Sequence, residues 1–180
     1  MPASASTFET IPVRAPERAS KNDSLAVTSQ SFGEGATIGR DFVHTDCGGG
    51  NTSPHLRWKN APPGTKSFAI TCFDPDAPTG SGYWHWLVFD IPASMTSVEA
   101  GAGTGGSPAG GRSGYSDFSI SSYGGPCPPK GDAPHRYVFT VYALDVAALG
   151  ADETTTGATV IFKMRGHVLA TGSITGTFAH

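Results

Sequence analysis

Short apolar segments separated by connections rich in Gly and Pro recur along this chain, a pattern that predicts many short β-strands. The segments are rich in aromatic and β-branched side chains, and several are apolar at almost every position instead of at every second one. Such continuous runs are typical of central strands that are covered on both faces. We expect strands over residues 25–30, 55–58, 68–73, 85–91 and 136–144, and a short terminal strand over 173–178.

One segment near the end of the chain has a helical pattern instead. Ile161, Met164, Val168 and Leu169 recur at helical spacing, and Gly172 follows as a stop signal. The sequence therefore predicts a mainly β fold with one amphipathic helix near the C-terminus.

The length of 180 residues and the apolar content of 38% favour a single core. We expect one domain over residues 25–180. Residues 1–24 are rich in Ser, Ala and Pro and lack the hydrophobic region of a signal peptide, so we expect a flexible lead there. Residues 100–123 are dominated by Gly and Ser, and this length predicts a functional or mobile loop.

Charge and cysteine usage narrow the class of partner and the compartment. The net charge is -3, and the 12 Lys and Arg residues are scattered, which argues against a nucleic-acid partner. No apolar run approaches the roughly 20 residues of a membrane helix. Cys47, Cys72 and Cys127 are odd in number and lack metal-ligand spacing, so none need be bonded and a reducing, cytoplasmic location is expected.

The ionisable residues gather where two proline-pinned loops meet apolar strands. Asp74 and Asp76 straddle a proline ahead of the strand that holds His85, and a second proline-rich loop precedes His135 and Tyr137. Residues two apart in a strand share a face, so His135 and Tyr137 point together, while the intervening arginine points away. If the two strands are neighbours, these side chains converge on a pocket.

Three stretches carry the most specific pattern: Ser53-Pro-His-Leu-Arg-Trp58, Asp74-Pro-Asp-Ala-Pro78 with His85, and Tyr123-Gly-Gly-Pro-Cys-Pro-Pro129 with His135-Arg-Tyr137. Together they resemble the motifs of the phosphatidylethanolamine-binding protein family, also called Raf kinase inhibitor-like proteins, and most closely its bacterial and archaeal branch. It implies an antiparallel Greek-key β-sandwich with a few peripheral helices and a small anion-binding pocket. Carried over by motif position, the pocket residues are Asp74, Asp76, His85, Gly125, Pro126, Pro128, His135 and Tyr137.

Two carboxylates beside a phosphate would repel it, so they must be neutralised by protonated histidines or by a cationic part of the ligand. A zwitterion such as phosphorylethanolamine fits, with hydrogen bonds from His85, His135, the Tyr137 hydroxyl and backbone N–H groups around Gly125. Because a carboxylate raises the pKa of a nearby histidine, anion affinity is expected to weaken above about pH 7. We expect affinities of about tens of micromolar to millimolar.

The resulting prediction is a regulatory module without a cofactor or a catalytic residue, which binds a phosphorylated small molecule or phosphoprotein and thereby modulates a kinase or another partner. The open edges of a sandwich and the resemblance to bacterial relatives favour a homodimer. Cys127 departs from the small or basic residues often seen between the two prolines of that loop, which leaves the chemistry of the pocket rim open.

Three alternatives stay open at this point. A hydrolase would use His135 as base, Asp74 to orient it and Cys127 as nucleophile. A protease inhibitor or interaction scaffold would act through residues 100–123. The Asp and His residues could instead hold zinc or iron, although the family pocket is not a metal site. The remaining histidines are assigned to structural or surface roles, namely His44, His55, His167 and His180.

Overall fold

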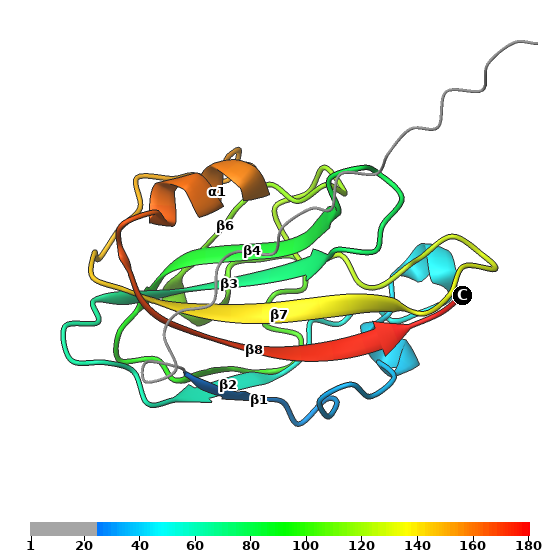
Figure 1. Cartoon of the computed structure of the whole chain (residues 1–180), viewed down its shortest axis with the longest axis horizontal. Helices are drawn as coiled ribbons and strands as arrows, with labels where there is room; N and C mark the ends of the chain where they lie inside the picture. The colour runs from blue at the N-terminus through cyan, green and yellow to red at the C-terminus, as the bar shows by residue number, and fades with distance from the viewer. Residues whose placement is uncertain (1–24) are drawn as a thin grey trace, which may run out of the picture.

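The computed structural model describes residues 25–180, and the lead expected over residues 1–24 lies outside them. Two antiparallel sheets form the described part of the chain (Figure 1). The small sheet has the order β1 (Ala26–Thr28), β2 (Leu56–Lys59) and β5 (Ser97–Val98). The large sheet has the order β6 (Arg112–Ser113), β4 (Tyr83–Pro92), β3 (Ser67–Asp74), β7 (His135–Leu144) and β8 (Val168–Phe178).

The large sheet is covered on both faces. One face packs against the small sheet, as in the contact of Trp58 on β2 with Phe68 on β3, whose ring centroids lie 5.3 Å apart. The other face packs against helix α1 (Gly157–Met164) through Val160 and Met164. The continuous apolar runs therefore belong to central strands with two buried faces, as predicted, and the mainly β, antiparallel fold is confirmed.

All of the predicted strands form, with shifts of a few residues at their ends. The terminal strand starts at Val168 instead of residue 173. The prediction lacked β5 and β6, because strands of two residues leave no periodic pattern in the sequence. Short 3-10 helices complete the described elements, at Arg40–Phe42, Thr45–Cys47 and Pro108–Gly110.

The predicted helix exists, but its range was wrong. It ends at Met164, and Gly166, with φ of 84°, reverses the chain, so that Val168 and Leu169 begin β8. Val168 is exposed and Leu169 is half-buried, so their helical spacing relative to Met164 is a coincidence of the sequence. Gly172 lies inside β8 and therefore is not a helix stop.

The Gly-rich segment 100–123 lies against the core over part of its length. A Cβ atom on Gly103 would stand 2.3 Å from the ring of the buried Trp86, so only glycine permits this close approach. The carbonyl of Gly103 accepts a hydrogen bond from the backbone N–H of Tyr123 at 3.0 Å. Gly103 thus serves close packing, and the segment brings Phe118 toward the site described below.

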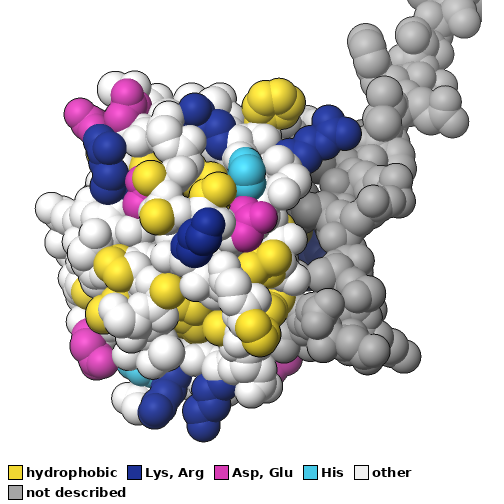
Figure 2. Space-filling view, turned by 90° about the vertical axis from the view of Figure 1, so that its left-hand side faces the viewer, with side chains coloured by type: hydrophobic (Ala, Val, Ile, Leu, Met, Phe, Trp, Pro, Cys, Tyr) yellow, Lys and Arg dark blue, Asp and Glu magenta, His cyan; other side chains and the backbone are white. Residues whose placement is uncertain are grey.

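Figure 2 shows the end of the molecule that is on the left in Figure 1, where Lys and Arg side chains are spread among acidic and apolar ones. That face has no extended surface of a single charge sign. Across residues 25–180, no helix combines the length and the apolar character needed to cross a membrane.

Candidate functional site

The sheet order brings the two proline-rich loops to one end of the large sheet. Strand β3 pairs with β4 on one side and with β7 on the other, with Asp74 opposite Tyr83 and Phe73 opposite Val138. The end of β3 therefore meets the beginnings of β4 and β7. A cavity of about 270 Å³ opens there. Its lining comprises Asp74, Ala77, Pro78, Thr79, Tyr83, His85, Phe118, Cys127, Pro128, Pro129 and His135.

Asp74 and His135 form a buried ion pair in the wall of this cavity. His135 Nδ1 lies 2.8 Å from Asp74 Oδ2, and Nε2 lies 3.3 Å from Asp132 Oδ2. Burial lowers the pKa of His135, but the hydrogen bonds and charges of the two carboxylates outweigh it, so the net shift is upward. Both ring nitrogens face carboxylates, so the imidazolium form of His135 would donate both of its N–H groups to protein groups.

Asp74 is also satisfied from its own loop. Its Oδ1 accepts hydrogen bonds from the backbone N–H groups of Asp76, at 2.8 Å, and Ala77, at 3.1 Å. This turn, in which an aspartate side chain caps the following backbone, fixes the loop after β3. Both oxygens of Asp74 are therefore occupied before any ligand arrives.

Asp76 points away from the cavity. Its carboxylate binds the Arg136 guanidinium in a bidentate pair, with contacts of 2.9 and 2.7 Å, and also accepts from the Arg136 backbone N–H. The hydrogen bonds and charge of Arg136 lower the pKa of Asp76, against a smaller effect of burial. Strand alternation correctly turned Arg136 outward, but Asp76 follows it and does not join Asp74 and His85 in lining the cavity.

Of the two histidines that line the cavity, His85 is the one with a ring nitrogen left for a ligand. It is 3% exposed, and its Nδ1 donates to the carbonyl of Gly124 at 2.8 Å. Within residues 25–180 its Nε2 has no hydrogen-bond partner, and the side chain lines the cavity. Burial lowers the pKa of His85 to about 4, although Gly124 and the Asp74 charge act in the opposite direction. The net rise in pKa that was expected from a nearby carboxylate thus occurs at His135, whereas at His85 burial outweighs the effect of Asp74.

The Gly125–Pro126 segment supports the site without lining it. The Gly125 N–H donates to the Asn51 side chain at 2.7 Å, and the Pro126 carbonyl accepts from the His44 N–H at 3.1 Å. A Cβ on Gly125 would stand 2.2 Å from the carbonyl oxygen of Phe42. The Gly125 N–H therefore anchors the loop and is not free for an anion, whereas Pro128, three residues on, does line the cavity.

Tyr137 lies behind the cavity wall. Its ring is fully buried and meets the His85 ring edge-on, with centroids 5.1 Å apart. Its hydroxyl has no hydrogen-bond partner in the described part of the chain. Burial, reinforced by the Asp74 charge, raises its pKa. Tyr137 thus positions His85, and its hydroxyl is not among the groups that line the cavity.

The site also includes three residues that the sequence analysis did not select, namely Tyr83, Phe118 and Asp132. The Phe118 ring lies 5.2 Å from His85, and the Tyr83 hydroxyl donates to the Asp117 carbonyl at 2.8 Å. Phe118 was one of few aromatic residues in a Gly/Ser-rich segment, and Asp132 precedes His135 by three residues. These signals were available, but only the tertiary structure distinguishes them from ordinary loop residues.

The rim of the cavity holds a disulfide, which corrects the expectation of unbonded cysteines. Cys47 and Cys127 are joined, whereas Cys72 is free and buried in the core. Burial raises the pKa of the Cys72 thiol. The two bonded residues are 80 positions apart, so no local spacing indicated the pair. Bonded in this way, Cys127 is not a thiolate nucleophile.

Known proteins agree with this architecture. The profile of the family described as "Phosphatidylethanolamine-binding protein" matches residues 28–179. The UPF0098 proteins YbcL and YbhB of Escherichia coli are 47% and 49% identical, over 84% and 73% of this chain and 86% and 84% of their own lengths. The crystal structure of E. coli YbcL, described as a member of the mammalian PEBP family, superposes with a TM-score of 0.83 at 43% identity, covering 87% of this chain and 98% of that one. This chain therefore belongs to the phosphatidylethanolamine-binding protein family.

Proposed function

We propose that this protein is a regulatory module that binds phosphoryl groups in the cavity beside His85. The observation that carries the proposal is the Nε2 atom of His85, a polar atom on a buried side chain that lines the cavity and has no partner within residues 25–180. Because Nε2 is not sealed in the core, as the Tyr137 hydroxyl is, a ligand in the cavity can pair with it. A volume of about 270 Å³ is below that of most sites for drug-sized molecules, which favours a small head group.

The charge arrangement supports a phosphoryl ligand despite the two nearby carboxylates. Asp74 is neutralised by His135, and Asp76 is neutralised by Arg136. The repulsion anticipated between these acids and a phosphate is thus relieved by pairs inside the protein, without a cationic ligand group. The side chain of Asp132 is 43% exposed and lies beside His135, so it is the acid to which the ammonium of phosphorylethanolamine would be matched.

Proton transfer accompanies binding in this proposal. Because the pKa of free His85 is about 4, its Nε2 presents a lone pair at neutral pH. A phosphoryl monoanion can donate its proton to this lone pair, or a dianion can bind to the protonated ring. Both descriptions place one shared proton between phosphate and His85. Binding to a phosphoryl dianion therefore takes up one proton from solution.

Head groups and phosphorylated protein segments both present a terminal phosphoryl group on a short tether, so either suits the cavity. Modulation of a kinase and assembly as a homodimer follow from the family resemblance and stay proposals. The disulfide weakens the argument for a cytoplasmic location, since structural disulfides persist in oxidising compartments. Alkylation of free thiols in intact cells decides this point. If Cys47 and Cys127 are both alkylated, the pair is reduced in the cell, which would support a cytoplasmic location.

A hydrolase is not proposed, because its two reactive groups are engaged elsewhere. Cys127 is bonded to Cys47, and both nitrogens of His135 face carboxylates. The scaffold alternative through residues 100–123 is supported by no comparable feature of this segment.

Titration with phosphorylethanolamine and with inorganic phosphate, followed by NMR or calorimetry, tests the proposal. Saturable binding at pH 6 that weakens at pH 8 is expected for the wild type. His85→Gln should lose it, whereas His167→Gln, a histidine paired with Asp145 away from the cavity lining, should retain it. Absence of saturable binding at both pH values, or equal binding by the two variants, would contradict a phosphoryl site at His85.

A further inference from the structure

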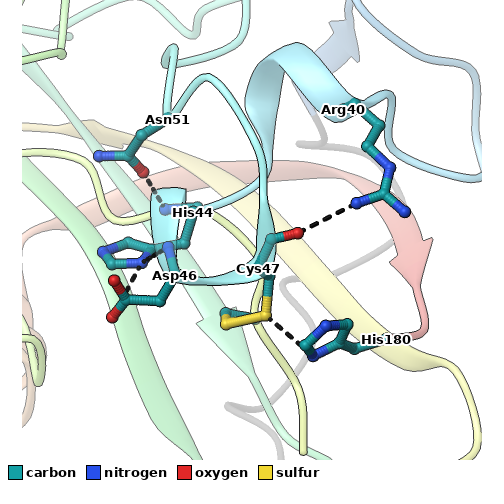
Figure 3. Close-up of a disulfide and its surroundings, with 8 residues drawn as sticks. Arg40, His44, Asp46, Cys47, Asn51 and His180 are labelled. Atoms are coloured by element: carbon teal, nitrogen blue, oxygen red, sulfur yellow. Dashed lines mark hydrogen bonds and ion pairs between the residues drawn. A yellow bond between two sulfur atoms is a disulfide. The ribbon is translucent and has the colours of Figure 1, made fainter. Parts of the chain in front are cut away.

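A second cluster of ligating side chains lies at the rim of the cavity. Cys47, Cys127 and His180 each offer one ligand atom, and these atoms all lie within 4.8 Å of one another. His180 Nδ1 is 3.2 Å from Cys47 Sγ, and Figure 3 shows the imidazole directed at the disulfide. The sequence analysis assigned His180 to a structural or surface role, and the three residues come from separate parts of the chain.

The parts that hold these residues are fixed by contacts outside the cluster. The Arg40 guanidinium donates to the carbonyl of Cys47 at 3.0 Å (Figure 3). His180 lies two positions after the end of β8, and its carbonyl accepts a hydrogen bond from the Gly131 N–H at 3.2 Å. Cys127 lies between two prolines, which restrict its backbone. The three side chains are therefore held together by the fold and not by the disulfide alone.

We propose that Cys47, Cys127 and His180 form a site for a thiophilic cation such as Zn²⁺ when the disulfide is reduced. Two thiolates and one imidazole are a ligand set that zinc uses when it keeps a fourth, open position. Zinc needs S and N atoms at about 2.3 and 2.0–2.1 Å, so two bound sulfurs stand about 3.8 Å apart in a tetrahedron. The Cα atoms of the two cysteines are 5.5 Å apart, and rotation about both Cα–Cβ bonds opens the sulfurs to that separation.

Zinc binding requires two steps, namely reduction of the disulfide and then coordination of the metal. A dithiol reductant transfers two electrons and two protons to the Cys47–Cys127 bond, so that two thiols form and the dithiol becomes a disulfide. Zn²⁺ then replaces the two thiol protons, which go to solvent, and His180 binds through its unprotonated Nδ1. The oxidised and metal-bound states exclude each other, because the same sulfurs make either bond. This inference does not depend on the phosphoryl site, although Cys127 lines both.

Zinc and cobalt titrations of the full chain test this site, with a water-soluble phosphine in place of the dithiol so that the reductant does not compete for metal. The reduced wild type should bind one equivalent of Zn²⁺ in a chelator competition, and Co²⁺ should give a sulfur-to-metal charge-transfer band. The oxidised protein should bind neither. Circular dichroism in the near ultraviolet reports whether the reduced chain keeps its fold or regains it with Zn²⁺.

Matched variants identify the ligands. Cys47→Ser/Cys127→Ser keeps Cys72 and should bind no Zn²⁺, which excludes the core thiol as the source of the signal. His180→Ala should bind at least about tenfold more weakly than wild type, whereas His167→Ala should be unchanged. The proposal is overturned if the reduced wild type takes up no stoichiometric zinc, if the oxidised form or the double variant binds equally well, or if the two histidine variants have the same affinity. A reduced chain that unfolds and is not restored by Zn²⁺ would also overturn it.

Discussion

Reduction of the Cys47–Cys127 disulfide should destabilise the fold chiefly by freeing the unfolded chain. The bond joins residues 80 positions apart, and closing a loop of that size removes about 15 cal/mol/K of entropy from the unfolded chain. This corresponds to about 4.5 kcal/mol of unfolding free energy near room temperature. For a domain of this size, the midpoint of thermal unfolding should fall by about 10 to 15 °C.

Urea denaturation of the oxidised and reduced protein, with a chelator to exclude metal, measures this difference. Reduction of the wild type changes no side chain, so the comparison isolates the cross-link. The denaturant slope should also rise, because an unbridged unfolded chain exposes more surface. The Cys47→Ala/Cys127→Ala variant should have the same unfolding free energy as the reduced wild type, and adding reductant should not change it. A difference below about 1 kcal/mol between the oxidised and reduced wild type would refute the chain-entropy reasoning.

Three further predictions follow from the site. Phosphoryl affinity should be nearly flat from about pH 4.5 to 6 and fall about tenfold per pH unit above that, because the complex holds one proton more than neutral His85 and a dianion; calorimetry showing a flat profile up to pH 8 would contradict this. The pKa of His85 is about 4 in the folded protein and about 6.5 when unfolded. Between these two pH values, His85 is protonated in the unfolded chain and neutral in the folded one. Neutral His85 therefore contributes fully to the free energy of unfolding above pH 6.5. As the pH falls to 4, the unfolded chain gains the proton and the free energy of unfolding decreases by about 3 kcal/mol. In urea titrations the unfolding free energy of His85→Gln should fall less than that of the wild type between pH 6.5 and 4. An identical fall in both proteins would contradict the low pKa of His85. Gly125→Ala should cost about 2 kcal/mol or more, because the Phe42 carbonyl blocks the new methyl group, whereas Gly106→Ala enters open space; equal thermal midpoints for the two would contradict the packing argument.

The strands were predictable because their patterns are local. Aromatic and β-branched runs between Gly and Pro identify β3, β4 and β7, and the shared face of His135 and Tyr137 follows from strand geometry. The helix was displaced because Val160 and Met164 provide one turn of buried contacts, while Val168 and Leu169 continue the same spacing into β8. Periodicity alone does not report the chain reversal at Gly166.

The sequence alone determined the mainly β architecture and placed Asp74, His85 and His135 near strand ends, because proline-restricted loops and strand alternation act over a few residues. The strands of His85 and His135 are not neighbours, as the prediction of a shared pocket assumed, and the three side chains gather because β3 lies between β4 and β7. Only the tertiary structure decided what each group can do. Arg136 draws Asp76 away from the cavity, and Asp132 occupies the second nitrogen of His135. Burial keeps His85 neutral, and a disulfide closes a loop across half the domain. Protonation, pairing and cross-linking depend on neighbours far apart in the chain, and no local pattern records them.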